Sequence, residues 1–341
     1  MIRIEEAVIS KLILHRVGTE ENEETLSSQV AALAGKEEEE LFKKILLKPF
    51  STHSATFEFA HETGIRYNVL FGLAKALYEG EDFIENSQQI ARYLASVSKH
   101  PNIKEGDVFV AKFENIGLEN GNYEGLGIYK FEDKETYIET NAADQEMHMQ
   151  FKRGLGSKKP EKACLILFTE EPYTLLIIDN STAATDYWQH EFIKHKPKND
   201  AANNTHDFLS LTKNFITAQM PHDFKVNKAD QIDLLNRSVE YFKTHDTFDK
   251  AGFEDEVLHH EVIIDSFRKF DNTYQKENAL ELSDNFQISP QAVKKQARIF
   301  KSVLKLDKNF HVYIHGNREL IEQGVDEDGR KFYKIYYEQE S

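Results

Sequence analysis

The spacing of apolar residues predicts the first strand and the first helices of the chain. Apolar side chains occupy both parities over residues 3–17, so we expect a strand whose two faces are both partly buried. Helices are expected from the acidic run at residues 37–40 onwards and over residues 67–78. A further amphipathic helix has one apolar face, formed by residues three or four positions apart: Phe83, Ser87, Ile90, Leu94 and Val97.

Beyond residue 105 the spacing changes to the two-residue period of β-structure. Val108 and Val110 alternate with Phe109 and Ala111, which indicates a strand that is covered on both sides or crosses a core. Turn-forming residues separate this strand from later segments of the same kind, at residues 127–131, 136–138, 163–168 and 173–178. We therefore predict an antiparallel meander of about five strands.

The rest of the chain is predicted to hold helices followed by strands. A helix capped by Asn204 or Thr205 precedes the expected domain boundary at Met220-Pro221. Ser289-Pro290 marks another helix start, because serine caps a helix and proline fits its first position. Two more helices are marked by apolar stripes: Ile232, Leu235, Val239 and Phe242, and Ile263, Phe267, Phe270 and Tyr274. Strands are expected at the end of the chain: Phe310–Ile314, Leu320–Val325 and Lys331–Tyr337.

These elements describe an α+β protein with two domains. The first domain, residues 1–220, is expected to contain an antiparallel sheet with packed helices. The second, residues 221–341, is expected to contain helices followed by a small antiparallel β-meander. The length of 341 residues fits two domains, at roughly 100–200 residues each.

The composition favours a cytosolic protein. No stretch approaches the roughly 18 apolar residues that a membrane span needs. Glu5 and Glu6 stand where a signal peptide has basic residues. Cys164 is the one cysteine, so no intrachain disulfide can form. We therefore expect a cytoplasmic protein without a membrane partner.

Catalytic and metal-binding motifs are not found in the sequence. It has no His-Glu-x-x-His motif, no pair of cysteines and no glycine-rich phosphate loop. Cys164 lies in an apolar run, where burial would raise the pKa of its thiol and suppress its reactivity. We therefore expect no catalytic residue, no metal and no cofactor.

One arrangement of charges keeps a metal-dependent nuclease as an alternative. Such enzymes place acids and a lysine at adjacent strand ends. Glu132-Asp133-Lys134 lies near a predicted strand end, with Glu114 or Glu124 upstream. In a chain of which 29% is charged, a triplet of this kind is expected by chance.

Local basic patches are the stronger functional signal. The formal net charge of −16 argues against an indiscriminate polycation, but contact with phosphates depends on local charge. One patch lies in residues 151–162, where glycines make the segment flexible and Glu161 is the one opposing acid. Its candidate DNA-binding residues are Lys152, Arg153, Lys158, Lys159 and Lys162.

A second patch lies on the helix that begins at Ser289-Pro290. Its candidate DNA-binding residues are Lys294, Lys295, Arg298 and Lys301. Three of them, Lys294, Arg298 and Lys301, share one side of the helix and lie beside an apolar stripe that includes Val293. A helix that is packed by one face and basic on the other suits a polyanion.

Two segments resemble the bacterial nucleoid-associated protein family, and the resemblance runs in matching order along nearly the whole chain. The first segment extends from Gly80-Glu81-Asp82-Phe83 to Val108, and the second from Asp186-Tyr187-Trp188 to Phe215. The chain looks like a distant branch of this family. The resemblance implies a cytoplasmic protein that co-localises with compacted chromosomal DNA and has neither enzymatic activity nor a cofactor. It supplies no DNA-contacting residues, so the candidate contacts rest on charge.

The sequence thus gives three hypotheses. The first is a non-enzymatic nucleoid-associated protein that binds DNA directly, mostly at phosphates and hence with weak sequence specificity. The second is a protein-interaction module that a DNA-bound partner recruits to the nucleoid, which the acidic balance favours. The third is the metal-dependent nuclease. The oligomeric state stays open, a homodimer included.

Overall fold

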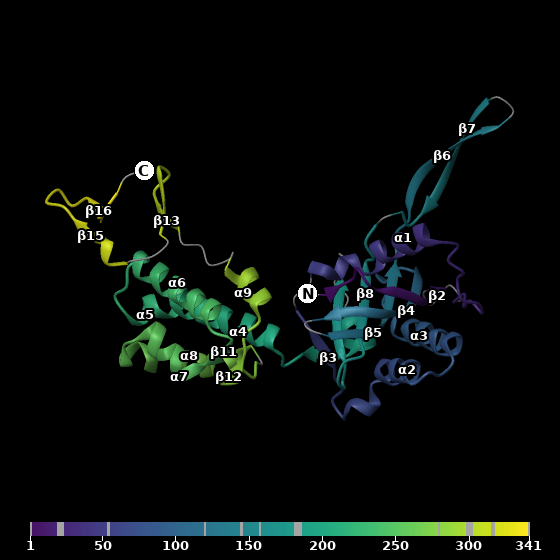
Figure 1. Cartoon of the computed structure of the whole chain (residues 1–341), viewed down its shortest axis with the longest axis horizontal. Coiled ribbons are helices and arrows are strands. Elements are labelled where there is room, and N and C mark those ends of the chain that lie inside the picture. Colours follow the sequence, from purple (N-terminus) through teal and green to yellow (C-terminus); the bar gives the residue numbers. More distant parts are fainter. Residues whose placement is uncertain are drawn as a thin grey trace. The chain divides into compact units, whose positions relative to one another are not determined.

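The computed structural model describes residues 2–18, 24–52, 55–118, 121–143, 146–156, 158–180, 186–278, 280–297, 303–314 and 318–339. The chain divides into two compact units, Met1–Lys198 and Asn199–Ser341 (Figure 1). Helices and antiparallel strands occur in both units, which confirms the predicted α+β class. No described helix is long and apolar enough to span a membrane.

Unit 1 is built on one antiparallel sheet. Its strands are β1 (Ile2–Arg3), β2 (Val8–Val17), β3 (Phe57–Phe59), β4 (Gly106–Leu118), β5 (Gly121–Phe131), β8 (Lys162–Leu167), β9 (Thr174–Asp179) and β10 (His195–Pro197). The strand order is β1-β4-β5-β8-β9-β3-β10, and β2 also pairs with β4. Its helices are α1 (Lys36–Leu46), α2 (Val69–Tyr78), α3 (Phe83–Val97) and a π-helical segment (Tyr187–Ile193). The helix predicted over residues 83–97 is therefore confirmed with those bounds.

Both faces of the central strands are buried, because alternate residues of β4, β5, β8 and β9 enter different cores. Val108 and Val110 of β4 belong to the core that contains Ile90 of α3. Phe109 belongs to the other core, and the centroid of its ring lies 6.1 Å from that of Phe42 on α1. In Figure 1, α2 and α3 lie on one side of the sheet and α1 on the other. The prediction of a strand covered on both sides is confirmed.

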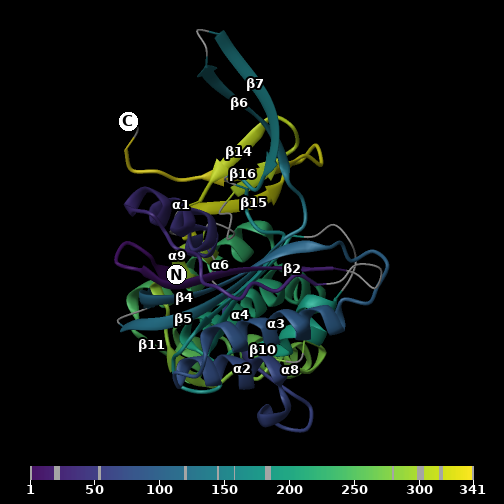
Figure 2. The ribbon, with the colours of Figure 1, turned by 90° about the vertical axis from the view of Figure 1, so that its right-hand side faces the viewer.

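Two strands leave the sheet and pair with each other. They are β6 (Glu135–Ala143) and β7 (Glu146–Gly154), and together they form an arm, residues 135–154, that extends away from the sheet of unit 1 (Figures 1 and 2). The side chains from Glu135 to Ala142 and from Glu146 to Arg153 are all exposed. The prediction that residues 136–138 belong to the meander is therefore wrong, whereas β4, β5, β8 and β9 do follow one another in the sheet.

Unit 2 begins well before Met220, because α4 (Ala201–Asn214) belongs to its core. The N-cap of α4 is Asp200, whose Oδ1 accepts a hydrogen bond from the N–H of Asn203 at 2.9 Å. The predicted caps, Asn204 and Thr205, instead lie buried within the helix. Met220 is also buried in the core of unit 2. The predicted division at residue 220 thus falls inside a core rather than between two.

Unit 2 combines helices with three pairs of short strands in the part that the structure describes. Its helices are α4, α5 (Met220–Asp223), α6 (Lys228–Thr244), α7 (Lys250–Phe253), α8 (Glu261–Glu277) and α9 (Pro290–Ala297). The paired strands are β11 (Thr247–Asp249) with β12 (Asn285–Gln287), β13 (Val303–Leu306) with β14 (Phe310–Tyr313), and β15 (Ile321–Val325) with β16 (Lys331–Ile335). The small C-terminal sheet that the sequence predicts takes the form of two separate two-stranded sheets.

Phenylalanine rings fill the core of unit 2. The ring centroid of Phe208 on α4 lies 4.2 Å from that of Phe248 and 5.2 Å from that of Phe253. Phe242 of α6 and Phe267 of α8 are buried in the same core. The apolar stripes predicted for these two helices are therefore the faces that pack.

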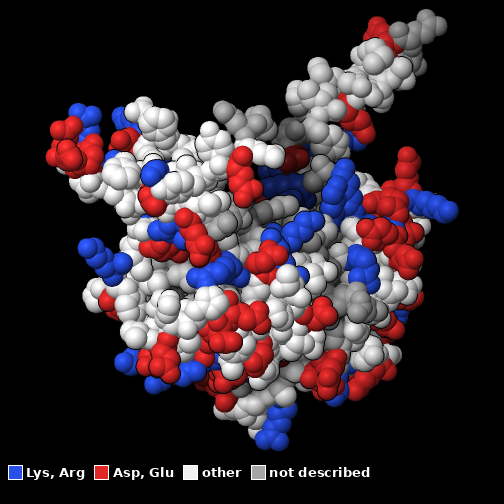
Figure 3. Space-filling model, turned by 60° about the vertical axis from the view of Figure 1, so that its left-hand side comes forward, with Lys and Arg blue, Asp and Glu red and all other residues white. Residues whose placement is uncertain are grey.

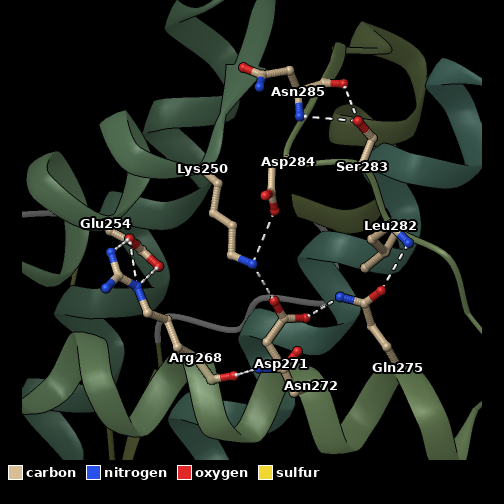
Figure 4. Close-up of polar contacts among 10 residues, drawn as sticks. All are labelled: Lys250, Glu254, Arg268, Asp271, Asn272, Gln275, Leu282, Ser283, Asp284 and Asn285. Carbon is tan, nitrogen blue, oxygen red and sulfur yellow. Dashed lines mark hydrogen bonds and ion pairs between the residues drawn. The ribbon is translucent and has the colours of Figure 1, made fainter.

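Polar contacts fix the segment that follows α8 (Figure 4). The Lys250 Nζ lies 2.7 Å from Asp271 Oδ2 and 3.1 Å from Asp284 Oδ1. Gln275 donates a hydrogen bond to Asp271 Oδ1 at 2.7 Å and accepts one from the N–H of Leu282 at 3.0 Å. These contacts tie the chain that leads to β12 and α9 to the helices α7 and α8.

His15 of β2 is a buried histidine with two hydrogen-bond partners. The N–H of Ser27 donates to its Nδ1 at 3.1 Å, so its Nε2–H donates to Ser87 Oγ, also at 3.1 Å. Burial, and after it the cation of Arg92, lowers the pKa of His15 from 6.5 to about 4. The folded state therefore holds the neutral ring.

We predict that unit 1 loses stability as the pH falls, in part through His15. Below pH 6.5 the unfolded state binds a proton that the folded state excludes until about pH 4. The free energy of unfolding should therefore fall by up to about 2 kcal/mol between about pH 7.5 and about pH 5. His15→Gln removes the titrating ring and keeps an amide that can donate to Ser87 Oγ, so urea unfolding of this variant should show a flatter pH dependence. An unchanged pH dependence would contradict this role of His15.

Candidate nucleic-acid interface

The basic patch of residues 151–162 is partly neutralised by acids from other parts of the chain. Lys152 of β7 forms an ion pair with Glu139 across the arm. The Lys158 Nζ lies 2.6 Å from Glu161 Oε1 and 3.9 Å from Asp133 Oδ2. Of these three acids, only Glu161 lies in the segment itself. Counting charges along the sequence therefore overstates the positive charge of this patch.

Lys162 does not reach the surface, which corrects the expectation that it contacts DNA. It is 1% exposed, and its Nζ lies 2.7 Å from Asp179 Oδ1. In the sheet it stands opposite Lys130 of β5, which is also buried. Both ammonium groups lie over the ring of Tyr187. The Nζ of Lys162 is 5.0 Å from the ring centroid, and that of Lys130 is 5.5 Å from it. The charge of Lys162 is thus held inside unit 1.

The ammonium group of Lys130, which lies opposite Lys162 in the sheet, has three hydrogen-bond acceptors. Its Nζ donates to the carbonyl oxygen of Lys104 at 2.6 Å, to Glu132 Oε1 at 3.1 Å and to Tyr187 Oη at 3.1 Å. Burial lowers the pKa of Lys130, against the opposing effect of Glu132. Sequence analysis misses this cluster, because its members come from β5, β8, β9 and the π-helical segment.

Two cations of the first patch remain open to a ligand. Arg153, at the end of β7, and Lys159 are both exposed. Neither forms an ion pair with a described residue. The first patch therefore shrinks from five candidate contacts to these two, with Lys152 and Lys158 shared with acids.

The helix α9 keeps the arrangement that the sequence predicts. Ala292, Val293 and Gln296 are buried, whereas Lys294 and Lys295 are exposed. The predicted contacts Arg298 and Lys301 lie outside the described residues. A helix with one packed side and lysines on the other is therefore present over residues 290–297.

Contacts with α4 hold α9 in place at both ends. Thr205 Oγ1 accepts a hydrogen bond from the N–H of Ser289 at 3.0 Å, and Gln296 donates to Ser210 Oγ at 3.4 Å. Ser289 Oγ accepts the N–H of Ala292 at 3.4 Å, which confirms the serine cap. Lys294 and Lys295 are thus presented from a fixed helix.

The charged triplet of the nuclease alternative is taken up by ion pairs. Glu132 pairs with the buried Lys130 at 3.1 Å. Asp133 pairs with Lys104 at 3.0 Å, and Lys134 pairs with Asp107 at 2.7 Å. The hydrogen bond from Lys104 lowers the pKa of Asp133, so this carboxylate stays ionised within its pair. Among the residues that the structure describes, no three or more His, Cys, Asp or Glu side chains are placed to hold a metal ion.

Cations and acids intermix over the surface in Figure 3. Blue and red side chains alternate over most of this face, without one broad basic area. The side of the arm that faces the viewer, at the upper right, shows few charged side chains. The cations on this face therefore lie in small groups.

Comparison with known proteins gives one match. Residues 13–338 match the family model described as NA37, nucleoid-associated protein YejK. No curated protein matches the chain, and no solved structure does either.

We predict that Lys162 stabilises unit 1, whereas Lys159 does not. Lys162→Ala removes the partner of Asp179 inside the sheet, which should lower the free energy of unfolding by about 3 kcal/mol. Lys159→Ala changes an exposed side chain without an ion pair and should have an effect within about 0.5 kcal/mol. Urea unfolding measures both variants. Equal effects of the two substitutions would contradict the assignment of Lys162 to the interior.

Proposed function

The chain belongs to the family of nucleoid-associated proteins, and on this basis we propose that it binds DNA directly through the exposed cations of α9. The family gives the nucleoid-associated role; direct contact and its location are the proposal. Binding would be mostly to phosphates, which position a protein on DNA but carry no sequence information, so sequence specificity would be weak. The protein would act at the nucleoid in the cytoplasm, without catalysing a reaction.

The observation that carries this proposal is the division of α9 into a packed side and a basic side. Hydrogen bonds to Thr205 and Ser210 fix the helix on α4, so the backbone that carries Lys294 and Lys295 needs no further ordering when they meet a phosphate. The surrounding sequence strengthens the charge. Residues 285–306 contain no acid, and they contain five cations: Lys294, Lys295, Arg298, Lys301 and Lys305.

The first basic patch adds a smaller contribution. Arg153 and Lys159 are exposed and can each meet a phosphate. Lys152 and Lys158 are already paired with acids, so a phosphate would have to compete with Glu139 and Glu161 for them. Their contribution to affinity should therefore be lower than that of Lys294 on α9.

Recruitment by a DNA-bound partner is the second candidate function. The net charge of −16 and the mixture of charges in Figure 3 favour it, because a long duplex would be repelled by most of the surface. It differs from the proposal in one observable: the purified protein would not bind a bare duplex at low salt.

We predict that reversing the charge of α9 weakens DNA binding. Lys294→Glu together with Lys295→Glu should raise the Kd for a labelled duplex by about tenfold or more at low salt, because each phosphate contact contributes to affinity through counterion release. Fluorescence anisotropy at about 50 mM salt measures this. Adding Arg298→Glu and Lys301→Glu should weaken binding further.

A matched variant on another helix of the same unit controls for net charge. Lys269 and Lys276 are exposed on α8, and Lys269→Glu with Lys276→Glu makes the same change in total charge. This control should reduce the affinity much less than the α9 variant. Equal losses in the two variants would mean that overall charge, not α9, determines binding.

A further inference from the structure

The two faces of the arm differ in chemistry. Directly paired residues of β6 and β7 share a face, and successive pairs alternate between faces. One face carries the pairs Ile138 with Phe151, Thr140 with Met149, and Ala142 with Met147. The other carries the pairs Tyr137 with Lys152, Glu139 with Gln150, and Asn141 with His148. We call the first set the apolar arm face.

The apolar arm face is open to solvent. Its four large side chains are highly exposed: Ile138 at 53%, Met147 at 74%, Met149 at 62% and Phe151 at 71%. At about 200 Å² for a fully exposed side chain of this size, they present roughly 500 Å² per arm. A patch of that size is at the upper end of what a monomer leaves exposed, and such patches commonly bind something.

An isolated two-stranded ribbon is only marginally stable in water. In the arm, β6 and β7 pair with each other and with no other described strand, so no second layer covers either face. The central strands of the main sheet in unit 1, by contrast, are covered on both faces. The arm is therefore the part of unit 1 that needs a partner to bury its apolar side chains.

We propose that a second copy of this chain docks on the apolar arm face, so that two arms pack face to face and antiparallel. Two faces of roughly 500 Å² bury about 1,000 Å² together, which reaches the lower limit for a specific interface. The ribbon would then become a two-layered sandwich, in which the alternating arrangement of apolar and polar residues is satisfied on both sides.

The position of Arg153 sets the direction of the two copies. Arg153 pairs with Thr136, two positions from the pair of Ile138 and Phe151, so it lies on the apolar arm face at the base of the arm. Parallel packing would bring the two Arg153 side chains together. Antiparallel packing places them at opposite ends of the interface.

Charge also favours a second copy over DNA as the ligand of the arm. Residues 135–154 contain four acids, Glu135, Glu139, Asp144 and Glu146, against two cations. A phosphate backbone would be repelled by this balance. The apolar arm face therefore offers a site for protein, and this inference does not depend on the DNA contact proposed for α9.

Sedimentation equilibrium of the full chain tests the proposal. The wild type should be dimeric at low micromolar concentration. Met149→Glu together with Phe151→Glu should raise the Kd of the dimer at least a hundredfold and give a monomer. The matched control is His148→Glu with Gln150→Glu, which places the same number of acids on the same strand but on the opposite face. It should remain dimeric.

Circular dichroism and thermal unfolding show whether the variants fold, which is expected because the substituted side chains are exposed. A monomeric wild type, or a dimer that Met149→Glu and Phe151→Glu leave intact, would overturn the proposal. A monomeric wild type whose DNA affinity falls in that variant would instead make the arm a DNA contact.

The antiparallel direction has its own test. Arg153→Ala should change the Kd of the dimer by less than about threefold, because the two Arg153 side chains lie at opposite ends of the interface. A dimer that this variant tightens by about tenfold or more would overturn the antiparallel arrangement, because the two cations would then meet in the wild type.

Discussion

The sheet of unit 1 is buried on both faces, and much of that unit follows from this constraint. Its central strands need apolar side chains on both sides, so a lysine within them must find its counter-charge in the interior. Lys130 and Lys162 stand opposite each other on β5 and β8. Glu132, Asp179 and the ring of Tyr187 balance their charges. Loss of either lysine would leave a buried acid unpaired at a cost of several kcal/mol, so these lysines are structural and are not placed for a ligand.

The same constraint accounts for the arm. β5 and β8 are neighbours in the sheet, yet residues 132–161 separate them in the sequence. No position in the sheet between these strands is open, so the intervening residues form a ribbon of their own. That ribbon has an apolar face but no layer to cover it, which leaves a second copy to supply one. In unit 2, the aromatic core fixes α4, and α4 in turn holds α9 with its lysines exposed.

Features that depend on neighbouring residues could be predicted from the sequence, and features that depend on distant residues could not. The helix over residues 83–97 and the alternation at Val108 are determined by local spacing, and both are confirmed. The burial of Lys162 depends on Asp179 and Tyr187, which the sequence places far from it. Nothing local separates the arm from the meander, because a strand has the same period in either sheet. The domain boundary expected at Met220 was wrong, because Met220 itself packs in the core of unit 2.

The candidate DNA-binding residues also divide into those whose surroundings are local in the sequence and those whose surroundings are not. The exposure of Lys294 and Lys295 could be predicted, because an amphipathic helix specifies its outer side through its own apolar residues. Lys152 could not be judged, because its acidic partner Glu139 becomes a neighbour only when the chain folds. A count of charges along a sequence is therefore a sound guide on a helix and a poor one in a connection between strands.

The salt dependence of duplex binding by the wild-type chain tests the central claim most directly. Direct contact with phosphates predicts binding at about 50 mM salt that weakens steeply by about 200 mM, with a log–log slope near −0.9 for each phosphate neutralised. Absence of binding at the lower salt concentration would contradict direct contact and would leave recruitment by a DNA-bound partner as the way this protein reaches the nucleoid.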